Sequence, residues 1–243
     1  MKRAVGWTLL GLGLFLGLLL VMAPAQLVGM WLTHGPLQLH APSGSLWSGR
    51  GQLVAAGVEL GELRWTLRPH ALLRGCIGLG VQLDGPDTRL MAEFELGVKS
   101  SSLTQLNGAV SKALLTRAAN HYDVDLQADL MLQHVTIHAT RALVTDASGD
   151  LSWTGGHVNY VLNGQSYAAE IGPLHGRLSA PAGRLRLDVF TQATHAQALR
   201  FTLSADGWGS AAVTRQFMGS VGFPWRGTAA ANEFVLEVQE HLF

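Results

Sequence analysis

The chain has 243 residues with 17 basic and 17 acidic side chains, so its formal net charge is zero. Zero net charge removes the long-range electrostatic case for binding nucleic acid or acidic lipid. The single cysteine, Cys76, excludes an internal disulfide framework and a multi-cysteine zinc site.

A long uncharged run near the N-terminus predicts a membrane span. After Lys2 and Arg3, residues 4–32 contain no charged side chain. About 20 apolar residues suffice for a helix to cross the hydrocarbon core, so residues 7–32 predict a single transmembrane helix. Gly13 and Gly17 form a small-xxx-small pair that would let two such helices pack closely in a homodimer, although glycine is also frequent in spanning helices that do not associate.

The two basic residues ahead of the span predict its orientation. Under the positive-inside rule, residues 1–6 stay in the cytoplasm and residues 33–243 are exported, which in a bacterium means an inner-membrane anchor and a periplasmic domain. Ala23-Pro24-Ala25 resembles the small-residue site at which signal peptides are cleaved, so a cleaved signal peptide is the alternative. The apolar segment is longer than the roughly 7–15 residues usual in signal peptides, which favours a retained anchor.

From residue 36 onward, apolar and polar residues alternate, which predicts antiparallel strands. The longest alternating run covers residues 126–138. Shorter runs predict strands at 92–98, 158–162, 183–190, 199–205 and 234–238. Asn163-Gly164 and Asp84-Gly85-Pro86-Asp87 predict turns between strands.

A glycine, a polar residue and a leucine recur together at the start of strand-like runs. The six copies begin at Gly44, Gly51, Gly61, Gly149, Gly176 and Gly183. In each copy we expect the glycine to make a turn and the leucine to point into the core. The irregular spacing argues against a solenoid and favours a meander of antiparallel strands.

One segment departs from the period of two. Apolar residues follow helical spacing at Leu103, Leu106, Val110, Leu114 and Leu115. Ser111 is predicted to cap a short helix Lys112–Asn120. We interpret this segment as a helical crossover within one mainly β domain, residues 33–243; the alternative is a split into halves 33–100 and 124–243.

The sequence contains no recognisable catalytic or metal-binding arrangement. It has no His-Glu-x-x-His motif, no nucleophile elbow and no phosphate-binding loop. Cys76 has no activating histidine nearby, so we expect a buried, unreactive thiol. The chain is therefore predicted not to be an enzyme, with no catalytic residues, cofactor or metal.

Two phrases combine tryptophan with arginine. Trp47 and Arg50 belong to the phrase at residues 44–50, and residues 63–69 alternate leucine and Trp65 with Arg64, Thr66 and Arg68. This alternation predicts a strand that buries leucine and tryptophan on one face and exposes arginine on the other. The arginine face is either an ordinary solvated surface or a contact surface for a partner protein.

These phrases carry a family resemblance. A short cytoplasmic start, one membrane helix, Gly-Ser-Leu-Trp-Ser-Gly-Arg (44–50), Leu-Arg-Trp-Thr-Leu-Arg-Pro (63–69) and residues 71–75, 149–156 and 206–208 follow one another in order. Together they resemble the protein N family of the bacterial type II secretion system. The resemblance covers nearly the whole chain, and the order of the motifs carries it.

The resemblance implies an inner-membrane component of the machine that moves folded proteins from the periplasm across the outer membrane. Its partners would be other secretion proteins, such as the inner-membrane platform and the secretin. The family is also thought to be related to envelope proteins of the AsmA kind, which implies a twisted or curled sheet with an apolar inner face. Two hypotheses follow: a structural subunit of the secretion machinery, and a periplasmic groove that holds lipid.

Overall fold

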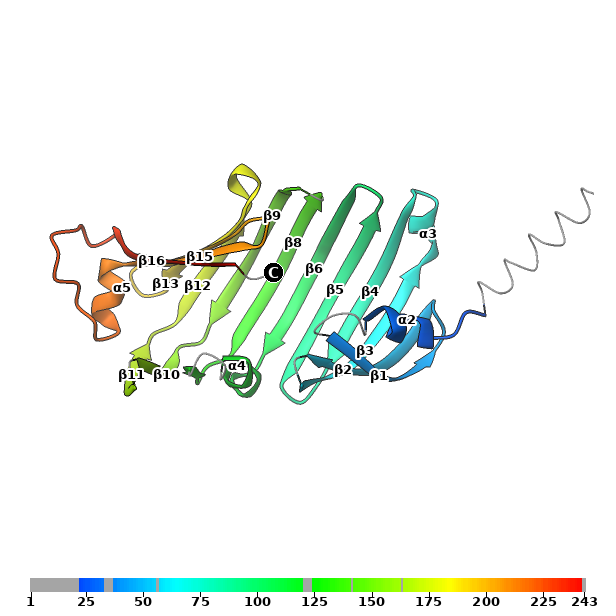
Figure 1. Ribbon diagram of the computed structural model, residues 1–243, viewed down its shortest axis with the longest axis horizontal. Coiled ribbons are helices and arrows are strands. Elements are labelled where there is room, and N and C mark those ends of the chain that lie inside the picture. Colours follow the sequence, from blue (N-terminus) through cyan, green and yellow to red (C-terminus); the bar gives the residue numbers. More distant parts are fainter. Residues whose placement is uncertain are drawn as a thin grey trace, which may run out of the picture.

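The computed structural model describes residues 22–32, 37–55, 57–119, 124–140, 142–162 and 164–241. These residues form one long antiparallel sheet, a small second sheet and a few short helices (Figure 1). The mainly β architecture predicted from the alternation is therefore confirmed.

Within the described residues, the large sheet contains thirteen strands whose spatial order follows the order of the chain. These are β1 (Leu37–Gly44), β2 (Ser48–Ala55), β3 (Val58–Arg68), β4 (Cys76–Asp84), β5 (Thr88–Gly97), β6 (Ser100–Val110), β8 (Leu130–Thr140), β9 (Val144–Trp153), β12 (Leu174–Ser179), β13 (Leu185–Thr191), β14 (Gln197–Leu203), β15 (Trp208–Thr214) and β16 (Phe234–His241). Neighbouring strands run antiparallel, so the sheet is a meander. The end strands β1 and β16 do not pair with each other, and the sheet stays open.

The remaining elements are short. In the described part of the chain they are the small sheet of β7 (Val124–Leu126), β10 (Gly156–Leu162) and β11 (Gln165–Ile171), and the helices α2 (Gln26–Leu32), α3 (Pro69–Leu72), α4 (Lys112–Ala119), η2 (Pro181–Gly183) and α5 (Arg215–Ser220). The small sheet and α4 lie together at one end of the strands (Figure 1).

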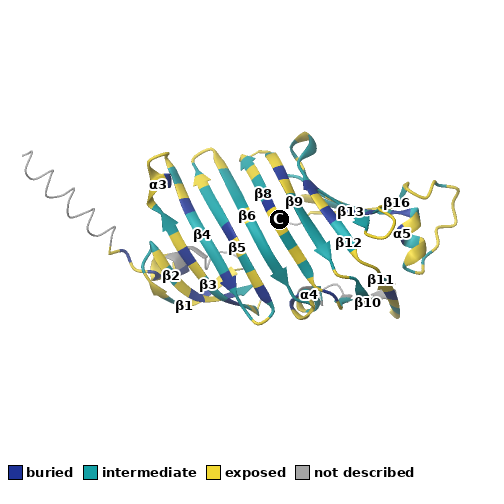
Figure 2. Ribbon diagram, turned by 180° about the vertical axis from the view of Figure 1, so that it is seen from behind, coloured by how far each residue is buried: buried dark blue, intermediate teal, exposed yellow. Residues whose placement is uncertain are grey.

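The large sheet is strongly curved. Its first strands, with α2, and its last strands, β15 and β16, curl toward the same side, the viewer's side in Figure 1. The view from behind shows the middle strands β4 to β9 in front (Figure 2). Twisted antiparallel strands curl in this way when bulges and glycines bend them. The sheet therefore has a concave and a convex face.

Both predicted turns connect paired strands. β4 ends at Asp84 and β5 begins at Thr88, and the N–H of Gly85 donates to the carbonyl of Thr88 at 2.7 Å. Leu162 of β10 pairs with Gln165 of β11, so only two residues join those strands. Gly164 has a φ of 76°, as a tight hairpin turn requires.

The predicted single strand over residues 126–138 is wrong, because the chain changes sheets at residues 127–129. Leu126 ends β7 in the small sheet, and β8 begins at Leu130 in the large one. The N–H of Gln127 donates to the carbonyl of His157 at 3.0 Å, which ties the segment to the small sheet. Alternation in the sequence continues through the break, so it gave no sign of the change.

The predicted helix is confirmed as α4, but its apolar residues upstream are not helical. Leu103, Leu106 and Val110 lie in β6. The pairing of β6 with β8 shifts between Leu103 and Leu106, where β6 has one extra residue. This bulge gives Leu103 and Leu106 their helix-like spacing of three, whereas Leu106 and Val110 are simply two strand periods apart. β6 and β8 pair directly, so the sheet continues from the N-terminal to the C-terminal half.

The predicted cap of α4 is also wrong. The hydroxyl of Ser111 donates to Asp87 Oδ1 at 3.1 Å. The first N–H of the helix, from Lys112, donates instead to Asp129 Oδ1 at 2.8 Å. A residue 17 positions later in the sequence therefore caps the helix.

The glycine-polar-leucine prediction holds only in part. Leu53 and Leu178 are buried, the leucines of the other four copies are half-buried, and most of the glycines do not make turns. Gly61 and Gly149 lie inside strands with φ values of 132° and 141°. A Cβ on Gly149 would lie 2.7 Å from the Cα of Val135 on the neighbouring strand, so this glycine permits a close approach of two backbones.

The C-terminal part of the predicted membrane span is described, and it is not one continuous helix. Pro24 forms a bridge with Ser45, and α2 begins only at Gln26. Residues 1–21, including Gly13 and Gly17, lie outside the described residues. In the segments that the structure describes, helices are too short or too polar to cross a membrane.

Candidate functional site

The concave face of the sheet is apolar along its whole length. Residues that pair directly across antiparallel strands project from the same face, so the register identifies the members of each face. Leu63 pairs with Leu83, which pairs with Leu90. Leu178 pairs with Leu187, which pairs with Phe201.

Bulges keep this apolar register through the middle of the sheet. Leu106 on β6 pairs with Val135 on β8 although the register shifts on both sides. Gln105 and His134, beside these two residues, take left-handed φ values of 53° and 50°. The extra residues in the two strands thus compensate each other, and the leucine and valine stay on the concave face.

We call this surface the concave face. Its apolar residues include Leu63, Trp65, Leu67, Ile77, Leu79, Val81, Leu83, Leu90, Phe94, Leu96, Leu103, Leu106, Val110, Leu130, Leu132, Val135, Ile137, Leu151, Trp153, Leu174, Leu178, Leu185, Leu187, Val189, Leu199, Phe201, Leu203, Val213, Leu236 and Val238.

Two separate clusters bury parts of the concave face. Near the N-terminus, Ala25 beside α2 packs against Leu39 and Trp65. Near the middle, Val135, Ala147 and Leu178 are buried where the sheet curls onto itself. Between and beyond these clusters the described residues supply no layer of helices over the face, and most of its side chains are half-buried (Figure 2).

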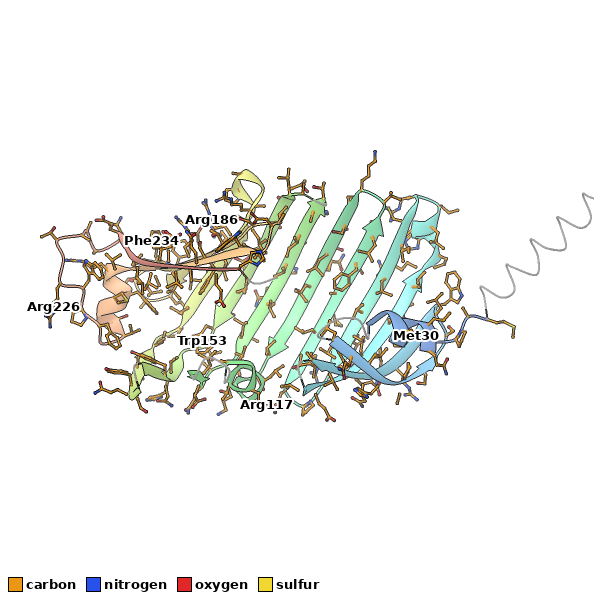
Figure 3. All side chains as sticks on the ribbon, in the orientation of Figure 1. Met30, Arg117, Trp153, Arg186, Arg226 and Phe234 are labelled. Atoms are coloured by element: carbon orange, nitrogen blue, oxygen red, sulfur yellow. The ribbon has the colours of Figure 1, made fainter. Side chains whose placement is uncertain are left out.

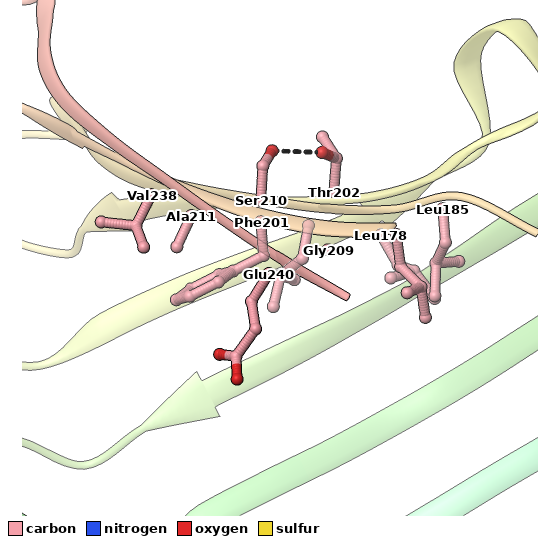
Figure 4. A pocket seen from close by; sticks show the side chains of 11 residues that line it. Leu178, Leu185, Phe201, Thr202, Gly209, Ser210, Ala211, Val238 and Glu240 are labelled. Atoms are coloured by element: carbon pink, nitrogen blue, oxygen red, sulfur yellow. Dashed lines mark hydrogen bonds between the residues drawn. The ribbon is translucent and has the colours of Figure 1, made fainter. Parts of the chain in front are cut away.

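The C-terminal curl forms an open apolar pocket on the same face. It encloses about 380 Å³ and is lined mainly by Leu178, Leu185, Leu187, Phe201 and Val238. Phe201 is 42% exposed and Val238 is 56% exposed. Figure 4 shows these side chains below the strands, while the hydrogen bond between Thr202 and Ser210 lies on the other side. The pocket is thus apolar in its interior and open to the concave side.

The convex face is polar. Arg68 on β3 pairs with Glu93 on β5, and Arg200 on β14 pairs with Asp188 on β13 at 2.7 Å. The guanidinium of Arg200 also lies 4.7 Å from the centre of the Phe234 ring. The two faces therefore differ sharply in chemistry.

The residues singled out in the sequence separate onto these two faces. Trp65 is 3% exposed on the concave side, and its indole N–H is buried without a hydrogen-bond partner among the described residues. Arg50 and Arg64 pair directly across β2 and β3 on the convex side. The alternation predicted for residues 63–68 is confirmed, and it separates Trp65 from the arginines.

The arginines have local acidic partners where the structure records ion pairs. Arg64 Nε lies 2.7 Å from Glu62 Oε1, and this hydrogen bond raises the pKa of Arg64 above its usual value. Arg68 holds Glu93 through two hydrogen bonds, one of them 2.7 Å long. Trp47 lies just before β2, where its carbonyl accepts from the N–H of Leu67 at 2.6 Å. Arg50, Arg64 and Trp65 border one open pocket beside Gly49, whereas Trp47 and Arg68 do not line it.

The titratable groups form no metal centre in the described segments. No three of their His, Cys, Asp and Glu side chains come together to hold a metal ion. Cys76, which was expected to be buried, is half-buried, and its Sγ lies 3.8 Å from the carbonyl oxygen of Arg74. The concave face, rather than a polar cleft, is thus the principal candidate site.

The comparisons with known proteins agree on one family. Residues 35–233 match the family described as Type II secretion system (T2SS), protein N. The chain is 36% identical over 102 residues to the type II secretion system protein N of Vibrio cholerae serotype O1, which covers 40% of each chain. It is 44% identical over 77 residues to the protein of the same name from Aeromonas hydrophila, covering 30% of this chain and 31% of that one.

The aligned segments thus span less than half the length of these curated relatives. No solved structure matches the chain. The family match, however, extends from the beginning of the sheet to the residue before β16 and includes both halves of the concave face. The chain therefore belongs to the type II secretion system protein N family.

Proposed function

We propose that this chain is a non-enzymatic, single-pass inner-membrane component of the secretion machinery, whose periplasmic sheet supports the export of folded proteins across the outer membrane. Family membership carries this proposal. The form of the sheet also supports it: an open meander with one apolar and one polar face offers two faces and two unpaired edges to other proteins. Its partners would be the inner-membrane platform and, on the outer side, the secretin.

Photo-crosslinking in cells that carry the complete secretion system tests this role. A photoreactive amino acid at Arg50 or Arg64 probes the convex face, and one at Phe201 probes the concave face. We expect adducts with a platform protein or the secretin from at least one face, at native expression levels. Adducts absent from both faces and from both edge strands, with secretion unchanged after deletion of the chain, would overturn the proposal.

The anchor itself needs a separate experiment. The uncharged residues 4–32 and the basic pair ahead of them favour a retained helix with the N-terminus in the cytoplasm. N-terminal sequencing of the protein from membranes distinguishes the alternatives. A retained anchor gives an N-terminus at or next to Met1, whereas signal cleavage gives one near residue 25.

The concave face supports a second candidate, a groove that holds the acyl chain of a lipid. The pocket of about 380 Å³ at the C-terminal curl falls in the size range of small-molecule sites, roughly 300–1,000 Å³, and its lining is almost entirely apolar. An acyl chain would cover side chains such as Phe201 and Val238 that are now 42% and 56% exposed.

Adjacent residues of β16 offer a matched pair of variants. Val238 faces the pocket, and Gln239 faces the convex side. After purification and lipid extraction, mass spectrometry should detect phospholipid with the full chain and with Gln239→Lys, but much less with Val238→Lys. Equal lipid content in the two variants, or a lipid-free wild-type chain, would contradict the groove.

A further inference from the structure

We propose that one row of strand ends of the large sheet docks onto an anionic lipid bilayer surface. This row, which we call the apolar rim, carries six exposed apolar side chains: Leu72, Leu73, Ile77, Leu96, Val98 and Leu143. They come from α3 and the loop after it, from the ends of β4 and β5, and from the loops that follow β5 and β8. The proposal does not depend on the secretion role.

Strand pairing brings these segments into the same row. Cys76 at the start of β4 pairs with Gly97 at the end of β5, so Leu73 and Val98 occupy neighbouring loops. Ser100 at the start of β6 pairs with Thr140 at the end of β8, which places the loop containing Leu143 next in line. A Cβ on Gly183, in η2, would lie 3.0 Å from a methyl group of Leu143. The rim thus follows consecutive strand ends along the sheet.

The side chains at the tips of the rim are unusually exposed for apolar residues. Leu73 is 91% exposed, Val98 is 77% exposed and Leu143 is 51% exposed. Isolated exposed leucines are common, but a row of them along neighbouring strand ends marks an interaction surface. Apolar loop tips in a row suit shallow insertion into the boundary between headgroups and acyl chains, which needs no matching pocket.

Charge selects an anionic surface as the occupant. Arg74 follows Leu73, Lys99 follows Val98, and Arg184 follows η2, and all three are exposed. Arg74 is paired with Glu95 at 2.6 Å, so these two charges offset each other and Lys99 and Arg184 supply the positive charge of the rim. Basic residues beside the apolar tips would contact lipid phosphates while the tips enter the apolar layer.

The opposite strand ends differ from the rim. The turn between β4 and β5 carries Asp84 and Asp87, and the segments around α4 carry Asp125 and Asp129. Arg89, Lys112 and Arg117, the last labelled in Figure 3, lie at the same end, where Arg117 is paired with Asp87. Acids and bases therefore nearly balance there, and the exposed apolar tips distinguish the rim from the opposite strand ends. Over the range of a Debye length, only the nearer strand ends determine attraction to a membrane.

The rim also continues into the concave face. Ile77 pairs with Leu96, and the next pair on the same face is Leu79 with Phe94. A bilayer in contact with the rim would bring its acyl region to the end of an apolar strip. If the groove holds lipid, this contact gives lipid a dry route between bilayer and groove; rim docking itself does not require that route.

Site-directed fluorescence in proteoliposomes tests the docking with the full chain. An environment-sensitive label is attached through Val98→Cys, or Leu73→Cys as a second position, in a Cys76→Ala background. The matched control is Pro86→Cys, in the turn at the opposite strand ends. In vesicles of phosphatidylethanolamine and phosphatidylglycerol, lipids brominated on their acyl chains should quench the label at both rim positions but not at Pro86→Cys.

Charge variants then test the electrostatic part. Removing one basic residue near an anionic surface should lower the ratio of docked to undocked protein about fivefold, so Lys99→Glu should lower that ratio at least as much, which is measured as reduced quenching. Lys112→Glu, the same change at the opposite strand ends, should leave quenching unchanged. Neither variant should alter the circular dichroism spectrum. Absence of quenching at both rim positions, or quenching that appears only when other secretion proteins are added, would overturn docking on lipid.

Discussion

Arg68 on β3 and Glu93 on β5 form an ion pair that passes over the intervening strand β4. Arg68 Nη1 lies 2.7 Å from Glu93 Oε2, and a second hydrogen bond joins the other nitrogen and oxygen. The pair crosses β4 at Gly80, where an added Cβ would lie 4.0 Å from Arg68 Nε. The ion pair thus joins β3 to β5 across β4 on the convex face.

This pair should contribute measurably to stability despite its partial exposure. A double-mutant cycle of Arg68→Ala and Glu93→Ala, measured by urea unfolding of the full chain in detergent, should give a coupling free energy of up to about 1 kcal/mol. The coupling should fall at high salt because the side chains are 40% and 27% exposed. The same cycle on Arg64 and Glu62, neighbours on one strand, should give less. A coupling free energy of zero at low salt would show that the ion pair does not stabilise the folded state.

Gly49 should be irreplaceable because Trp65 occupies the space beside it. A Cβ at Gly49 would lie 2.4 Å from Cζ2 of the Trp65 ring and 2.7 Å from the carbonyl oxygen of Ser43. Gly49→Ala should therefore lower the free energy of unfolding by about 1–3 kcal/mol. Gly172→Ala is the matched control, since a Cβ there meets nothing within 4 Å, and it should be nearly neutral. In a Trp65→Leu background, the effect of Gly49→Ala should shrink without vanishing.

The cap of α4 can be tested by hydrogen exchange. Because Asp129 accepts from the N–H of Lys112 at 2.8 Å, Asp129→Ala should weaken the first turn by about 1 kcal/mol and speed exchange of that amide roughly fivefold. Ser111→Ala should leave that amide unchanged, since the Ser111 hydroxyl bonds to Asp87. Faster exchange of the Lys112 amide in Ser111→Ala than in Asp129→Ala would instead support the cap by Ser111 that the sequence predicted.

Asp125 should make stability depend on pH in the acid range. Hydrogen bonds from Gln127, Thr116 and Asn159 stabilise its carboxylate and lower the pKa of Asp125 below the ordinary value of 3.8. A group whose pKa is lower in the folded state stabilises the protein above the unfolded pKa. This contribution is lost as the pH falls from 3.8 through the lower folded value.

Urea unfolding between pH 6 and pH 2 should therefore show a steeper acid loss for the wild type than for Asp125→Asn. Gln127→Ala removes the largest single cause of the shift, so it should move the pKa of Asp125 back toward 3.8 in an NMR titration. An unchanged titration in this variant would contradict the assigned cause.

Much of the strand content could be predicted from the sequence. Alternation at residues 63–68 predicted which side chains of β3 face inward, and the residue types at 84–87 and 163–164 predicted both turns. These features depend on period and turn chemistry within a few residues, so the chain carries them locally. The repeated glycine-polar-leucine copies likewise predicted leucines such as Leu53 and Leu178 as core.

Other features arise only when strands meet. The spacing of Leu103 and Leu106 looks helical because the bulge at Gln105 adds a residue to β6, and a bulge exists only relative to a partner strand. The cap of α4 comes from Asp129, which is near only because residues 127–129 cross from one sheet to the other.

The sequence by itself therefore determined the mainly β class, the inward and outward sides of individual strands, and the family. The tertiary structure decided that the apolar sides of successive strands join into one open concave face, and that Leu73, Val98 and Leu143 lie along one row of strand ends. Alternation determines which side of a strand is apolar, but strand order, register and curvature depend on contacts between distant residues, which no local pattern contains.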